Sequence, residues 1–123
     1  MARVAAEAVG LQTIHQVVDD FYRRVQDDPV LGTRFSVVTD WAAHKARIVH
    51  FWWVALGGAA YEPYRYRVVY THRALEVRAS EIQRWLDLFA DCVQSALPES
   101  LAAVWLHRAK AMGGSLAQVV ARV

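Results

Sequence analysis

Apolar residues recur at every third or fourth position through most of the chain. Between residues 13 and 28 the apolar positions are Ile14, Val17, Val18, Phe21, Tyr22 and Val25. This spacing places them on one face of an amphipathic helix. Segments 41–56, 80–96 and 99–123 repeat the pattern, and 68–77 shows it over a shorter length. No segment alternates as a strand does, so the sequence predicts an all-α fold of packed helices.

Residues with capping chemistry mark the expected helix ends. Thr13 and Asp40 are N-cap candidates, because their side-chain oxygens can accept hydrogen bonds from the first turn. Ser80 followed by Gln83 has the pattern of a capping box. Gly57 is expected to end the second long helix as a C-cap residue.

The chain has 123 residues, which is enough for one domain with one core. Residues 1–10 are rich in alanine and predict a tail or a short helix, followed by a single domain over 11–123. Gly113 and Gly114 interrupt the apolar pattern of the last helix. They predict a kink or a close contact with another helix.

Charge and composition exclude several classes of function. The chain has 12 Arg and 2 Lys, but they are scattered and form no basic stripe, so nucleic-acid binding is not expected. The most apolar run, 48–60, is shorter than the roughly 20 residues that span a bilayer. Cys92 is the only cysteine, so no internal disulfide can form, and we expect it to be a buried, small apolar residue. A cytoplasmic monomer is the expected form.

Two histidines lie on predicted helices among apolar residues. His44 shares a face with Trp41 and Ile48, where it is either a boundary residue with one hydrogen bond or a polar group that faces a ligand. His72 shares a face with Val68, and a lone helical histidine is more often structural than a ligand. Neither spacing decides between these interpretations.

Tyr22 and Trp85 add polar-tipped aromatic side chains within apolar stripes. Each must find a partner for its O–H or N–H, or point into a cavity. The five Trp residues fit either a core or a pocket for a flat ligand. Together with His44 and His72 they suit a buried planar cofactor, with one histidine below its plane and polar groups above.

Four stretches carry a resemblance to a known family. They are DDFYRRVQDDPVLGTRF at 19–35, WAAHKARIVHFW at 41–52, His72, and RWLDLFADCV at 84–93. In combination, over roughly residues 11–120, the chain resembles the truncated haemoglobins, most closely their third group. The loop before His72 departs from the family pattern, which commonly has a glycine and a basic residue there.

The resemblance implies a two-over-two helical sandwich around haem b. His72 would be the proximal ligand of the iron. Tyr22, His44 and Trp85 would form the distal side, where Tyr22 and Trp85 direct hydrogen-bond donors at a bound gas. The remaining cofactor contacts implied are Phe35, Ile48 and Trp52 against the haem, and Arg47, Arg65 and Arg67 toward its propionates.

The implied function is binding of O2, NO, CO or other small haem ligands. Chemistry of the family includes NO dioxygenation, hence detoxification, and peroxidase-like turnover, which we expect in preference to bulk oxygen transport. Either reaction needs a separate reductase, because the chain has no flavin or nicotinamide domain of its own. The alternatives are a gas sensor or a globin-like helical module that binds a partner without haem.

Overall fold

The computed structural model describes residues 4–66 and 77–121, and every regular element in them is helical. The elements are α1 (Ala5–Val9), α2 (Leu11–Asp27), α3 (Leu31–Arg34), the short 3-10 helix η1 (Phe35–Val37), α4 (Trp41–Ala55), α6 (Ala79–Ala96) and α7 (Glu99–Ala121). The segment predicted as a short helix over 68–77 lies almost entirely outside the described residues. The prediction of an all-α fold is confirmed.

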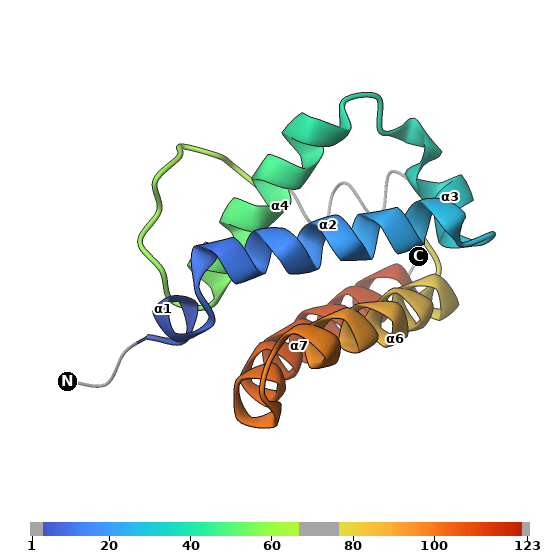
Figure 1. Ribbon diagram of the computed structural model, residues 1–123. Coiled ribbons are helices and arrows are strands. Elements are labelled where there is room, and N and C mark those ends of the chain that lie inside the picture. The colour runs from blue at the N-terminus through green and yellow to red at the C-terminus, as the bar shows by residue number, and fades with distance from the viewer. Residues whose placement is uncertain (1–3, 67–76, 122–123) are drawn as a thin grey trace.

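The helices form two layers (Figure 1). In one layer α2 packs against α4, and in the other α6 runs beside α7. Contacts between α2 and α6 join the layers, and α1 contacts α2, α4 and α7 at one end. This is the two-over-two arrangement that the family resemblance implied. Among the helices that the structure describes, none is long and apolar enough to cross a membrane.

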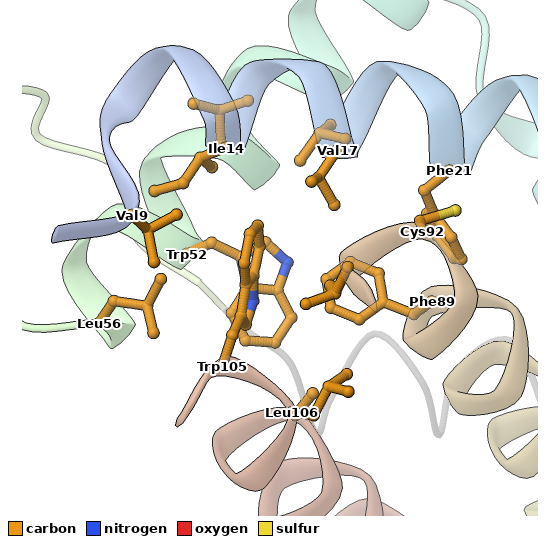
Figure 2. Packing of buried hydrophobic residues seen from close by; sticks show 14 of the residues in the cluster. Val9, Ile14, Val17, Phe21, Trp52, Leu56, Phe89, Cys92, Trp105 and Leu106 are labelled. Atoms are coloured by element: carbon orange, nitrogen blue, oxygen red, sulfur yellow. The ribbon is translucent and has the colours of Figure 1, made fainter. Parts of the chain in front are cut away.

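The core lies where the two layers meet (Figure 2). All six apolar positions predicted for the face of α2 are buried. Trp52 of α4 stacks on Phe89 of α6, with ring centroids 5.3 Å apart and planes 18° apart. Trp105 of α7, fully buried, packs edge-on against both rings. Burial of such large apolar surfaces is the main favourable term in folding.

Two predicted helix starts are displaced. Helix α2 begins at Leu11 rather than after Thr13, because Gly10 with φ +91° ends α1 and also serves as the N-cap of α2. Helix α6 begins at Ala79, and its capping contact runs from the Arg78 N–H to the Glu81 carboxylate at 2.9 Å. Ser80 is therefore inside the helix, and the predicted capping box with Gln83 is wrong. The acidic side chain of Glu81 is the better acceptor.

Helix α4 has the ends that the sequence predicted. The Asp40 carboxylate accepts a hydrogen bond from the Ala43 N–H at 3.0 Å. At the other end Gly57 has φ +97°, a conformation that glycine adopts without steric cost. The carbonyl of Ala55 accepts from the Arg108 guanidinium at 2.7 Å, and that of Leu56 accepts from the Ala6 N–H at 2.9 Å. Carbonyls left unpaired by the end of the helix are thus bonded by α1 and α7.

Gly113 of α7 marks a close helix contact, one of the two predicted outcomes. A Cβ at Gly113 would lie 2.8 Å from Cδ1 of Leu86 on α6, whereas Gly114 faces open space. The apolar pattern of 99–123 also predicts burial of Val104, and this prediction is wrong, because 41% of its surface is exposed. It lies on the outer side of the helix.

Candidate functional site

A cavity of about 400 Å³ lies between the two helical layers. Its volume falls in the range of small-molecule and cofactor sites. The walls are mainly apolar and aromatic. Its contributors include Tyr22 from α2, Phe35 from η1, His44 and Ile48 from α4, and Trp85 from α6. The structure thus brings together five side chains that the family resemblance implied for one site.

His44 faces this cavity from inside a cage of aromatic rings. Its ring lies 5.0 Å from Tyr22, 5.7 Å from Trp41 and 6.1 Å from Phe35, measured between centroids. The Nε2 atom is buried and has no hydrogen-bond partner. Burial, with a smaller contribution from the positive charge of Arg47, holds the pKa of His44 below its usual value. The imidazole is therefore neutral at pH 7, with one buried nitrogen to satisfy.

Tyr22 lies directly beside His44 on the cavity wall. Only 3% of its surface is exposed, and burial raises the pKa of its phenol well above the ordinary value. The hydroxyl consequently keeps its proton throughout the physiological range and can act as a hydrogen-bond donor. Phe35 packs against the ring edge-on, with centroids 5.5 Å apart.

Trp85 supplies a second polar-tipped aromatic group to the cavity. Its ring is stacked on Phe89 at 5.1 Å and on Trp52 at 6.4 Å. This stack fixes the plane of the indole, whose N–H can only donate. Trp52 also lines the cavity, as the sequence predicted, but it is 98% buried and serves the core as well.

The apolar face of α4 predicted to carry Trp41, His44 and Ile48 is only half-buried. His44, Ile48 and Phe51 line the cavity, and Trp41 packs against His44, whereas Trp52 is buried. Val49 and His50 are buried instead, on the adjacent side of the helix. His50 accepts hydrogen bonds at Nε2 from the N–H groups of Tyr61 and Glu62. Sequence reasoning missed this residue, although a histidine in so apolar a run was a usable signal.

The three arginines predicted to face the cofactor differ in where they lie. Arg47 lines the cavity and donates a hydrogen bond to the carbonyl of Arg65 at 2.7 Å. Arg65 itself is exposed and does not contribute to the cavity wall. Arg67 and His72 lie outside the described residues.

An ion pair that the sequence did not predict borders the cavity. The guanidinium of Arg34 bonds the carboxylate of Glu81 and thereby joins the end of α3 to the start of α6. This hydrogen bond holds the pKa of Glu81 below its usual value. Both residues line the cavity. A glutamate in the first turn of a helix was the only local signal, and it indicates capping rather than a distant partner.

Within the described ranges, no three His, Cys, Asp or Glu side chains gather in a way that could hold a metal ion. A search of curated proteins found no match to the chain. The family model of the bacterial-like globins matches residues 5–116, which is most of the chain. An all-helical two-layer fold around one apolar cavity agrees with that match. The chain therefore belongs to the bacterial-like globins, a family that implies a haem cofactor and small gaseous ligands.

Proposed function

We propose that the cavity binds haem b, that His72 ligates its iron, and that the protein binds O2, NO or CO for redox chemistry. The single observation that carries this proposal is the buried, unpartnered Nε2 of His44, a residue that lines an apolar cavity beside Tyr22. A buried polar atom without a partner destabilises a protein by about 1–3 kcal/mol. A ligand that bonds it would remove that penalty.

The residues present fit a haem group. Its flat apolar ring requires a cavity with apolar walls, and Phe35, Ile48 and Trp85 contribute such surface. Its propionates require cations at the margin, and Arg47 lines the cavity. Haem iron, when bound, supplies the position that takes up a diatomic gas and exchanges electrons.

Three side chains of this chain would determine what happens to the gas. Tyr22 holds a proton on its hydroxyl, and Trp85 holds one on its indole nitrogen, so both can donate. His44 is neutral and can donate or accept, depending on which nitrogen carries the proton. Fixed donors in a water-poor pocket stabilise developing negative charge more than they would in water.

These hydrogen-bond donors favour a reaction of the bound gas over the transport of oxygen. Bonds to the ligand slow its release, which suits NO dioxygenation or peroxidase-like turnover and does not suit rapid oxygen delivery. Either reaction would draw electrons from a separate reductase. Assignment to the third group of truncated haemoglobins, the monomeric state and the cytoplasmic location stay predictions.

The test is the absorption spectrum of the protein reconstituted with haemin, reduced, and exposed to carbon monoxide. We expect a sharp Soret band that shifts to a histidine-ligated carbonyl form. His72→Ala should lose stable haem binding, because the iron loses its protein ligand. His107→Ala is the matched control, since His107 is an exposed histidine of α7 away from the cavity. A broad spectrum like that of free haemin in the unaltered protein would instead favour a haem-free helical binding module.

A further inference from the structure

His50 is the centre of a hydrogen-bonded cluster beside the cavity, outside the set of residues that face the proposed ligand. It lies on α4 with 2% of its surface exposed. The rings of Tyr61, Tyr64 and Tyr66 surround it at centroid distances of 4.6, 5.2 and 6.2 Å. These tyrosines belong to the loop that follows α4, so His50 attaches that loop to the helix.

The hydrogen bonds fix the protonation of the ring. Nε2 lies 3.2 Å from the backbone nitrogens of both Tyr61 and Glu62, and both N–H groups donate to it. Nε2 must therefore carry no proton, so the neutral ring carries its proton on Nδ1. Nδ1 in turn lies 2.6 Å from the Tyr66 hydroxyl and donates to it.

The same chain of bonds reaches Arg47. The Tyr66 hydroxyl donates to the backbone carbonyl of Arg47 at 3.1 Å. The guanidinium of Arg47 lies over the rings of Tyr64 and Tyr66, at 4.8 and 5.4 Å from their centroids. Arg47 also donates to the Arg65 carbonyl of this loop, which occupies one of its five N–H donors. Both Arg47 and Tyr66 line the cavity.

We propose that His50 is a positioning residue that, by holding the loop over residues 61–66 against α4, orients the Arg47 guanidinium toward a carboxylate of the cavity ligand. This inference rests on the proposed function, since the carboxylates in question are those of haem. An arginine held by two rings and a carbonyl keeps a defined direction, so less side-chain entropy is lost when it binds an anion. His50 does not itself touch the ligand in this proposal.

The test compares haemin with haemin dimethyl ester, in which both carboxylates are blocked. The measured quantity is the rate of haem loss to an excess of a haem-scavenging apoprotein, expressed as the ratio of ester to haemin. In the unaltered protein we expect the ester to be lost faster. His50→Leu should lower the ratio by about three- to tenfold, because it removes the contribution of an oriented ion pair.

Several variants separate positioning from general stability. Arg47→Gln should lower the ratio equally, and combining it with His50→Leu should lower it no further. Leu106→Ala is the control, because it removes buried apolar volume on α7 away from both the loop and the cavity. It should speed the loss of both haems alike and leave the ratio unchanged. If His50→Leu does not fold, Tyr66→Phe removes only the hydroxyl link and should still lower the ratio.

A ratio that is unchanged in His50→Leu, or in Tyr66→Phe where that variant takes its place, would overturn the proposal and leave His50 a purely structural residue. A ratio unchanged in Arg47→Gln would overturn it as well. Failure of the proposed function would look different, because the unaltered protein would then bind neither haemin nor its ester.

Discussion

Two side-chain nitrogen atoms in the described part of the chain are buried without a hydrogen-bond partner, and they lie in different surroundings. Nε1 of Trp105 is in the closed core, among the rings of Trp52 and Phe89 (Figure 2). Nε2 of His44 is covered as well, but it belongs to a residue that lines the cavity. Trp105 does not line the cavity, whereas His44 borders a space that can receive a ligand.

The difference shows when an unsatisfied polar atom is evidence of function. The indole of Trp105 contributes large apolar contacts, which outweigh one unpaired N–H. Packing of His44 contributes less stability, because its ring is smaller and only half-buried. The unpaired atom of the residue that lines the cavity is therefore the one that indicates a ligand.

Truncating the core tryptophan should have the largest effect. We expect Trp105→Ala to lower the free energy of unfolding of the haem-free protein by about 3–5 kcal/mol, because it leaves a large void. Trp85→Ala, on the cavity wall, should lower it by less, since that side chain is already half-exposed. Urea unfolding followed by far-UV circular dichroism measures both. Equal losses would mean that the two regions do not differ in packing.

Removing a hydrogen-bond donor from the cavity wall should change the rate at which the bound gas dissociates. Tyr22→Phe and Trp85→Phe should each speed oxygen dissociation by about tenfold or more, because each removes a hydrogen bond to a partly charged ligand. Trp105→Phe is the matched change in the core and should leave the dissociation rate alone. Stopped-flow displacement of oxygen measures the rates. Unchanged rates in both wall variants would assign the stabilising bond to His44.

Replacing the unpaired histidine should stabilise the haem-free protein. We expect His44→Leu to raise its free energy of unfolding by about 1 kcal/mol, because a buried polar atom without a partner is removed. The same denaturation experiment on the haem-free form measures it. A loss of stability would show that His44 has a structural role that its missing hydrogen bond does not reveal.

The smallest predicted effect concerns the core thiol. Burial raises the pKa of Cys92 to about 12, whereas the thiol of the unfolded chain ionises near its ordinary value of 9.0. The unfolded state therefore loses its proton first, and stability falls as pH rises through that range. Between pH 7 and 9 the unaltered protein should lose about 0.4 kcal/mol more than Cys92→Ala. Identical slopes for the two proteins would contradict the assigned burial.

The sequence predicted what depends on local patterns. The buried face of α2, the Asp40 cap and the turn at Gly57 follow from the chemistry of neighbouring residues, and the structure has them as expected. Tyr22, His44 and Trp85 were identified because polar groups interrupted apolar stripes. The Arg34–Glu81 pair was missed, since its members are 47 positions apart and each looks like an ordinary surface residue.

Which residues of a helix are buried was also harder to predict than where the helix lies. Helix α4 faces a cavity on one side and a loop on the other, so its apolar residues do not form a single stripe. Val49 and His50 are therefore more buried than Ile48, although Ile48 fits the period better. Periodicity identifies the helix, whereas the neighbours it meets decide which residues are covered.

The end of α4 also bears on the order in which the fold can form during synthesis. Its last carbonyls are bonded by Ala6, which is made early, and by Arg108, which follows Ala55 by 53 positions. On the ribosome α4 would emerge well before its second partner. We expect the end of this helix to fray on nascent chains that stop short of α7. The part of the cavity wall that carries Trp52 would then become fully ordered only after α7 is complete.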